Sequence, residues 1–183
     1  VGGAAPDAIT AMGRMIASLH DAEGSVAVAG LKSAVASDLD YSEQRLREES
    51  GLLDGVELIG SGSILTRMWA KPSITTIGID APSVDTSSNT LVPQAAAKIS
   101  MRIAPDEDPL DAYQLLADHL RSHAPWGVKV AVVLDDQGAG FSAPANGPGY
   151  RQARAAFTDG WGVAPAAVGH GRARAVGAPV ASR

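Results

Sequence analysis

The sequence predicts an α+β fold in which two helices pack on one face of an antiparallel sheet. Two segments carry the roughly 3.6-residue apolar period of amphipathic helices, and several others carry the alternation or β-branched composition of strands. Along the chain these segments follow the order helix, strand, excursion, strand, strand, helix, strand. A further strand just before residue 1 would complete the βαββαβ order of a ferredoxin-like domain, and we expect that first strand to be cut off.

Composition excludes several classes of protein. The chain has 183 residues, a net charge of −5 and no cysteine. With 45% hydrophobic and 19% charged residues it is too apolar for intrinsic disorder, and no apolar run reaches the roughly 18 residues of a membrane span. The missing cysteine excludes disulfides, thiolate zinc sites and cysteine nucleophiles. Since the charge is acidic, nucleic acid is a poor partner. We expect a globular, cytoplasmic protein that binds neither nucleic acid nor a membrane.

The first helix is predicted to begin after Asp7, which is well placed as its N-cap. Its apolar face comprises Ile9, Met12, Ile16 and Leu19. The helix should end near Gly24, because glycine favours helix termination. Residues 25–29 then alternate as a short strand does.

An excursion, the stretch between the predicted strands at residues 25–29 and 73–79, separates this short strand from the next part of the sheet. Residues 41–50 are strongly charged, with Ser42 able to cap and Gly51 able to end a helix, so we expect a short exposed helix there. Residues 60–63 form a loop. The β-branched residues of 73–79 then predict the clearest strand of the chain.

Residues 90–103 predict a long strand with one polar face. Its odd-numbered positions from 95 to 103 are apolar, whereas Lys98, Ser100 and Arg102 lie on the other face.

The second helix is predicted to begin at Asp108, with Pro109 in its first position. Its apolar stripe comprises Leu110, Tyr113, Leu116 and Leu120. Residues 128–134 predict the last good strand, which completes a domain over residues 1–135. The remainder, residues 136–183, is rich in glycine, alanine and proline; it shows one helix at 150–158 and no core-forming period from residue 162 onward.

Histidines are the first candidates for chemistry, because a zinc site without cysteine must use histidine and carboxylates. His119 and His123 are spaced i, i+4 on the second helix, a spacing that can bind a metal, but no third ligand is visible. His20 and His170 lie elsewhere in the sequence. The helix macrodipole alone favours histidine near a helix C-terminus. We therefore expect structural or surface roles, and we name no metal ligand and no catalytic residue.

The candidate binding residues are Asn89, Thr90 and Arg102. A guanidinium on a regular strand is rigidly held and suits bidentate binding of a carboxylate, and the alternative is an exposed arginine in a surface ion pair. The adjacent acids Glu48 and Glu49 invite an interpretation as a catalytic pair, but they end a polar helix, where solvated charge is typical. The sequence has neither a nucleophile elbow nor a phosphate-binding loop.

Three ordered segments resemble a known family. They are Val-Gly-Gly with the helix that ends Ser-Leu-His-Asp-Ala-Glu-Gly, then Trp-Ala-Lys-Pro-Ser-Ile-Thr-Thr-Ile-Gly-Ile, then Asn-Thr-Leu-Val-Pro-Gln-Ala-Ala-Ala-Lys-Ile-Ser-Met-Arg-Ile-Ala-Pro-Asp-Glu-Asp-Pro. With them, residues 1–134 resemble the lid domain of the co-catalytic zinc metallopeptidases of family M20. That family includes carnosinase, glutamate carboxypeptidase and aminoacylase.

The resemblance implies a ferredoxin-like lid and dimerisation domain over residues 1–135, and a linker with a partial or aberrant return into a catalytic domain over 136–183. That catalytic domain would hold two zinc ions in the parent enzyme. Arg102 matches the strand arginine that binds the substrate carboxylate, and Asn89 or Thr90 matches a polar residue that reaches the partner subunit's substrate. The implied partners are a second copy, the catalytic domain of the parent, and a small peptide or N-acyl amino acid.

We therefore predict the dimerisation and substrate-positioning lid of a zinc-dependent dipeptidase or related amidohydrolase, inactive as an isolated fragment. The alternative is a free-standing, dimeric ferredoxin-like module that binds a small carboxylate ligand or is regulated by it. RNA binding on the sheet is excluded by the acidic charge and by the aromatic content of 4%. A missing first strand would leave its neighbour with unpaired backbone groups, so we also expect a dimer or aggregation.

Overall fold

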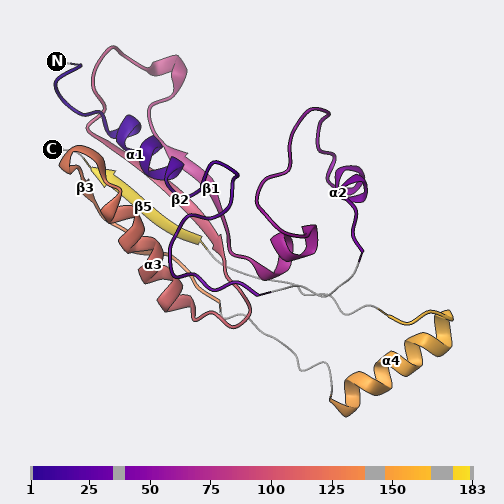
Figure 1. Cartoon of the computed structure of the whole chain (residues 1–183). Coiled ribbons are helices and arrows are strands. Elements are labelled where there is room, and N and C mark those ends of the chain that lie inside the picture. The colour runs from indigo at the N-terminus through magenta and orange to yellow at the C-terminus, as the bar shows by residue number, and fades with distance from the viewer. Residues whose placement is uncertain (1, 35–39, 139–146, 166–174, 182–183) are drawn as a thin grey trace.

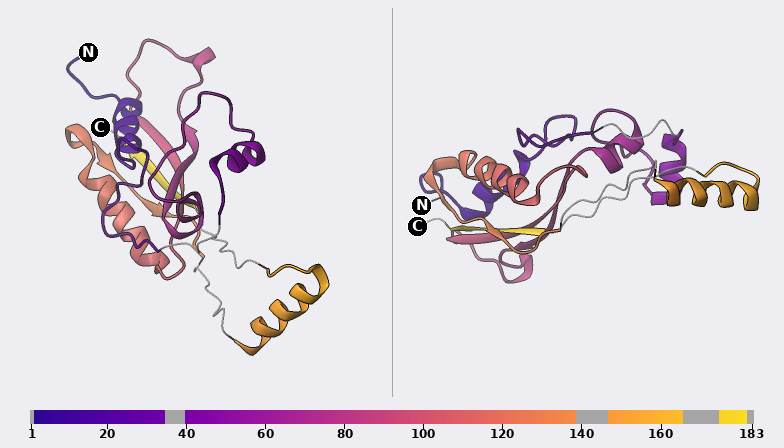
Figure 2. Two further views of the ribbon diagram at one scale, coloured as in Figure 1. Left: turned by 45° about the vertical axis from the view of Figure 1, so that its right-hand side comes forward. Right: turned by 90° about the horizontal axis from the view of Figure 1, so that it is seen from below.

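The computed structural model describes residues 2–34, 40–138, 147–165 and 175–181. One antiparallel sheet contains β1 (Ser73–Asp80), β2 (Gln94–Arg102), β3 (Lys129–Val130), β4 (Val133–Leu134) and β5 (Ala175–Ala181). The strand order is β1-β2-β5-β3, with β4 also paired to β5. Helices α1 (Ala8–Ala17) and α3 (Pro109–Ser122) lie on one face of this sheet (Figures 1 and 2). The predicted α+β class is confirmed.

The two helices begin at the predicted caps. The Asp7 carboxylate accepts the N–H of Thr10 at 2.8 Å and the N–H of Val92 at 3.0 Å, so it joins the start of α1 to the segment that leads into β2. The Thr10 hydrogen bond is the main reason why the pKa of Asp7 lies below its usual value. Asp108 caps α3 by accepting the N–H of Leu110 at 2.8 Å.

The hydrophobic core lies between the sheet and the two helices. The predicted alternation of β2 is confirmed, since Ala95, Ala97, Ile99 and Met101 are buried while Lys98 and Arg102 are exposed. On α3 the buried positions are Ala112, Leu116, Ala117 and Leu120. Leu110, which the apolar period assigned to the same stripe, is 52% exposed.

β5 fills the central position of the sheet. It lies between β2 and β3 and runs antiparallel to both, which is the place of the first strand in the βαββαβ order. We predicted an unpaired edge on the neighbour of that strand, and this is wrong because β5 pairs with β2 from Gln94 to Ser100. The part of the chain without a core-forming period thus contributes a strand.

The last predicted strand is divided into β3 and β4. β3 ends at Val130, opposite Val180, and β4 begins at Val133, opposite Gly177. The two residues between them lie opposite Pro179 and its neighbour. Proline has no N–H group to donate to a ladder, so the pairing is interrupted there.

The excursion forms its predicted helix, α2 (Glu43–Ser50). Ser42 caps it by accepting the N–H of Arg45, and Gly51 ends it with φ of 67° in the left-handed region. A π-helical turn, η1 (Thr66–Ala70), then leads into β1, and a short 3-10 turn, η2 (Val84–Thr86), follows β1.

The short strand predicted at residues 25–29 does not form, and the structure shows only an isolated bridge between His20 and Val26. The reason is the side chain of Asp21, which accepts the N–H groups of Glu23 at 3.1 Å and Ser25 at 2.8 Å and so closes a turn.

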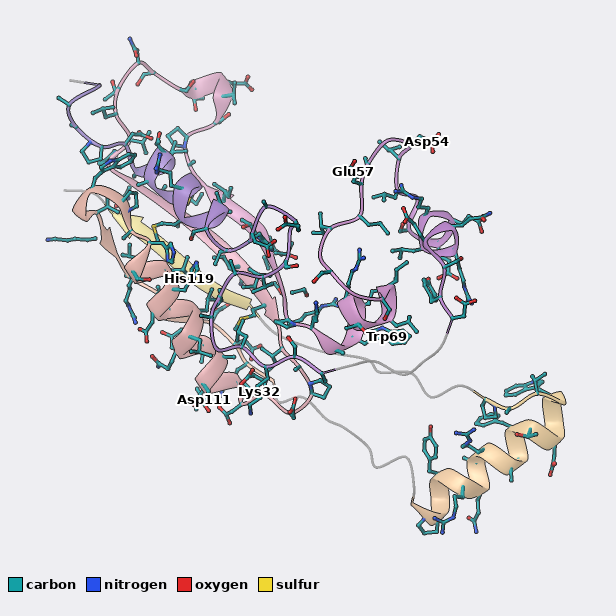
Figure 3. The ribbon with its side chains drawn as sticks, viewed as in Figure 1. Lys32, Asp54, Glu57, Trp69, Asp111 and His119 are labelled. Carbon is teal, nitrogen blue, oxygen red and sulfur yellow. The ribbon has the colours of Figure 1, made fainter. Side chains whose placement is uncertain are left out.

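A buried carboxylate fixes the point where the excursion leaves the core. The side chain of Glu107 is 4% exposed, accepts the backbone N–H of Lys32, and lies 3.9 Å from the Lys32 ammonium. The same ammonium donates to the Asp106 carbonyl at 3.0 Å. Figure 3 shows Lys32 beside α3.

Helix α4 (Pro148–Trp161) covers the predicted residues 150–158 and stands apart from the sheet (Figure 1). None of its residues is buried. A 3-10 turn, η3 (Pro125–Gly127), lies between α3 and β3. Among the residues that the structure describes, no helix is long and apolar enough to cross a membrane.

Candidate functional site

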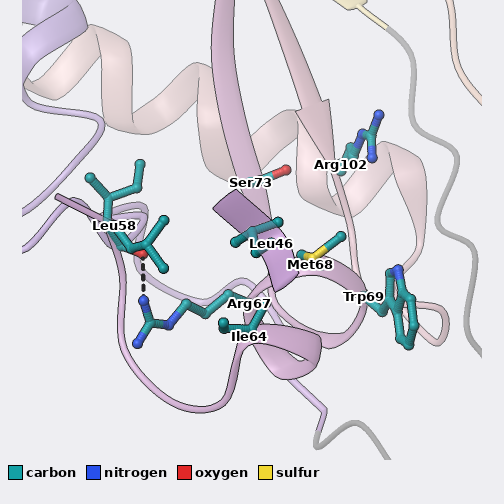
Figure 4. Close-up of a pocket in the computed structure, with 9 residues that line it drawn as sticks. Leu46, Leu58, Ile64, Arg67, Met68, Trp69, Ser73 and Arg102 are labelled. Atoms are coloured by element: carbon teal, nitrogen blue, oxygen red, sulfur yellow. Dashed lines mark hydrogen bonds between the residues drawn. The ribbon is translucent and has the colours of Figure 1, made fainter. Parts of the chain in front are cut away.

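The candidate site is a pocket at the end of the sheet where β1 begins and β2 ends. Ser73 and Arg102 lie directly opposite each other on these strands. The excursion provides the remaining walls, and the pocket has a volume of about 490 Å³ (Figure 4). Its lining from the excursion comprises Leu46, Leu58, Ile59, Ile64, Arg67, Met68 and Trp69.

Two guanidinium groups line this pocket, and their surroundings differ. Arg67 donates from Nε to the Gly62 carbonyl at 2.8 Å and from Nη1 to the Ile59 carbonyl at 3.1 Å, so it holds the loop in place. Arg102 is exposed and makes no hydrogen bond or ion pair with any residue of the described ranges. The alternative of a surface ion pair is therefore not realised by Arg102 within these ranges. Its strand neighbour Lys98 does form one, with Asp135 at 2.6 Å.

The structure does not bring Asn89 and Thr90 to Arg102. Both are exposed in the connection between β1 and β2, at the end of β2 opposite to Arg102. At about 3.3 Å per residue, β2 alone spans roughly 26 Å from Gln94 to Arg102. Within one chain, the three predicted residues therefore cannot bind one small ligand together.

Sequence reasoning did not identify Ser73, Met68 or Trp69 as pocket residues. Ser73 faces Arg102 only because of the register of the β1 and β2 hairpin, which places Ser73 opposite Arg102 and Thr75 opposite Ser100. Hairpin order and alternation alone could not give this register, because a bulge between Thr76 and Gly78 shifts the pairing by one residue. No sequence signal linked the excursion to the end of β2.

A glycine allows the loop of the excursion to pack closely. Gly24 has φ of 79°, and a Cβ on it would lie 2.6 Å from the Cβ of Ile59. The Gly60 N–H also donates to the Glu23 carbonyl at 2.7 Å. The turn after α1 therefore supports the loop that lines the pocket.

A second hollow of about 360 Å³ adjoins the first and is more polar, with His20, Ser33, Ser61 and Lys71 in its lining. Its main cation is occupied, because the Lys71 ammonium donates to the Ser61 carbonyl at 2.7 Å and to the Ser61 hydroxyl at 2.9 Å. Since Arg67, which it shares with the first pocket, is also occupied, this hollow is a poorer anion site.

His119 on α3 and His123 at the C-cap of that helix have structural contacts. The rings of His119 and His123 stack with their centroids 4.0 Å apart (His119 is labelled in Figure 3). His119 Nε2 lies 3.0 Å from the Ser18 carbonyl and joins α3 to α1, and His123 Nδ1 lies 2.8 Å from the His119 carbonyl. Among the described residues, no group of three His, Asp or Glu is placed to hold a metal ion. His170 lies outside the described residues.

The acidic pair of α2 lies on a solvated face, as predicted. Glu48 accepts from Gln44 at 2.9 Å, and Glu49 pairs with Arg45 at 2.7 Å and accepts from the Tyr41 hydroxyl. These are local contacts within the excursion, and neither acid lines the pocket.

Protonation of His119 should destabilise the fold. Burial lowers the pKa of His119, and the neighbouring His123 lowers it further. Because the folded pKa lies below the unfolded one, His119 favours the fold above the unfolded pKa of about 6.5, and this contribution is lost as the pH falls below that value. We expect the urea midpoint of the parent chain to decrease when the pH is lowered from about 7.5 to about 5.5. This decrease should be smaller in H119Q, whereas the control H20Q should behave like the parent chain. An equal slope in H119Q and in the parent chain would contradict this assignment.

Comparison with known proteins identifies the family of the chain. Residues 1–128 match the family model of the peptidase dimerisation domain. A cysteinylglycine-S-conjugate dipeptidase from Corynebacterium striatum is 31% identical over 164 residues, which cover 88% of this chain and 36% of that protein. The chain therefore spans about a third of the length of this curated relative.

Solved structures share the fold. The dipeptidase Dug1p of Saccharomyces cerevisiae matches with a TM-score of 0.71 and 21% identity, over 90% of this chain and 37% of that one. Human carnosine dipeptidase 1 matches with a TM-score of 0.70 and 18% identity, over 91% and 38% of the two chains. The family model covers most of the chain, and the curated relative is itself a peptidase. The chain belongs to the M20 peptidase dimerisation domain family.

Proposed function

We propose that this chain is the dimerising lid of a metal-dependent dipeptidase and that Arg102 positions the carboxylate of the substrate. The guanidinium of Arg102, which has no partner among the described residues and is held at the end of a regular strand beside a pocket, carries this proposal. A guanidinium binds a carboxylate through two parallel hydrogen bonds, which fixes the orientation as well as the position of the ligand. The names of the relatives support a dipeptide substrate, which ends in such a carboxylate.

The distance between the two groups of predicted residues supports a role in two different active sites. Since β2 separates Asn89 and Thr90 from Arg102 by roughly 26 Å, one protomer presents its two groups to different ligands. In a homodimer, we propose that Arg102 contacts the substrate of one subunit while Asn89 or Thr90 contacts that of the other.

Hydrolysis requires groups that the described residues do not supply. Zinc, where it is bound in enzymes of this kind, activates the attacking water. The described residues do not fit such an ion, because no three His, Asp or Glu side chains converge. We therefore propose that the chain alone does not cleave dipeptides and that the two zinc ions belong to another part of the parent enzyme.

The test is to measure metal content, dipeptide hydrolysis and molar mass on one purified sample. We expect no stoichiometric zinc, no turnover and the mass of a dimer. Zinc-dependent turnover by this chain would refute the inactive-lid proposal, and a monomeric mass at high concentration would refute the dimer.

The exposed edge of β1 is the proposed dimer contact. β1 is the terminal strand of the sheet, and Ile77 and Ile79 on it are 55% and 58% exposed. Unpaired strand edges with β-branched residues pair readily with another chain. We expect I79K to convert the dimer to a monomer in light scattering, because a lysine on an edge strand disfavours pairing with another strand. V84K, at a residue 90% exposed in the following loop, is the control and should stay dimeric.

A further inference from the structure

We propose that the pocket beside Arg102 recognises an apolar side chain on the carboxylate ligand, so that the excursion makes the lid selective for apolar substrates. This inference rests on the proposed role of Arg102 and adds the chemical class of the ligand.

The walls of the pocket are apolar, and part of their surface is exposed to solvent. Six of its lining residues are Leu46, Leu58, Ile59, Ile64, Met68 and Trp69. Ile59 remains 66% exposed and Met68 42% exposed. Apolar surface that gathers around a hollow is typical of a binding site, whereas single exposed apolar residues are ordinary.

The charge at the mouth of the pocket selects an anion. No Asp or Glu lines the pocket, and of its two guanidiniums Arg67 is occupied by carbonyl groups while Arg102 is unpaired in the described structure. Ser73 lies opposite Arg102, so its hydroxyl is available as a second donor near the same end. In Figure 4, Ser73 and Arg102 lie near each other with Met68 and Trp69 on the same side, whereas Arg67 lies beside Leu58 and Ile64.

Size and rigidity agree with a small ligand. The volume of about 490 Å³ falls within the range of small-molecule sites. The loop is fixed before any ligand binds, because Arg67 holds Ile59 and Gly62, and Gly60 donates to Glu23. An amino-acid carboxylate with one branched or aromatic apolar side chain matches this combination of charge, wall and volume.

The test compares two probes, N-acetyl-L-leucine and N-acetylglycine, which differ only in the apolar side chain. NMR titration of the Trp69 indole N–H reports occupancy, since Trp69 lines the pocket. We expect N-acetyl-L-leucine to bind about 10- to 100-fold more tightly, as burial of one aliphatic side chain allows. R102Q should lose both probes. M68Q, which keeps the length of the side chain, should lose the preference and retain N-acetylglycine.

Controls separate the two levels of the proposal. L53Q alters an apolar residue of the same excursion that is 75% exposed and outside the pocket, so it should bind like the parent chain. L46Q provides a second pocket variant in case M68Q fails to fold. Equal binding of the two probes, both lost in R102Q, would overturn the apolar selectivity and leave the role of Arg102 intact. Binding that survives in R102Q, or no binding of either probe, would overturn both.

Discussion

Ending the chain after residue 165 is expected to abolish the cooperative fold and cause association. The change removes β5, which pairs with β2 on one side and with β3 and β4 on the other. Each lost backbone hydrogen bond costs about 0.5–1.5 kcal/mol, so the loss of a central strand approaches the roughly 5–15 kcal/mol that holds a small domain together. The freed edge of β2 then invites pairing between chains. Urea unfolding and light scattering measure the two effects.

A break in α4 provides the matched control in the same part of the chain. A156P places proline inside this helix, where none of the residues is buried. We expect its urea midpoint to equal that of the parent chain. If the truncated chain unfolds cooperatively at the parent midpoint, β5 does not hold the sheet together.

The second large effect is expected from L116A. Leu116 is fully buried on α3, within the core that includes Ile99 and Met101 of β2. Truncation of a buried leucine removes apolar contacts and leaves a cavity, which costs about 3–5 kcal/mol. Urea unfolding of L116A should therefore show a much lower midpoint with a similar slope.

Leu110 on the same helix gives the control for this substitution. It is 52% exposed, so L110A makes the same chemical change without a cavity. We expect a loss below about 1 kcal/mol. Equal losses in L110A and L116A would mean that α3 presents a different face to the sheet.

The comparison of these two leucines shows how far the sequence predicts the core. The positions at which α1 and α3 begin, after Asp7 and Asp108, were predictable because capping depends on a few adjacent residues. Which residues of α3 are buried depends on the angle at which the helix lies on the sheet. Ala112 and Ala117 are buried in the core, whereas the larger Leu110 is exposed.

The short strand at residues 25–29 was predicted wrongly because the Asp21 side chain competes for the backbone N–H groups there. β5 could not be predicted, since Gly177 and Pro179 disfavour strand formation and only pairing with distant residues stabilises it.

Of the residues that line the candidate pocket, the sequence singled out only Arg102. Alternation along β2 placed Arg102 on the polar face, and the resemblance gave it a carboxylate as its ligand. The apolar walls come from Leu46 through Trp69, far from Arg102 in the sequence, and they reach it only through the packing of the excursion. The separation of Asn89 and Thr90 from Arg102 follows from strand geometry, which the resemblance alone did not reveal.

The position of β5 also has a kinetic consequence. Ala95 pairs with Val180, and Ser100 pairs with Ala175, so the central ladder joins residues about 75–85 positions apart in the chain. Closure of such long loops costs entropy before any ladder forms, and folding rates fall as the mean sequence separation of contacts rises. The hairpin of β1 and β2 is local by comparison and can form early. The hairpin of β1 and β2 should therefore form first, and β5 should pair with β2 at the centre of the sheet last.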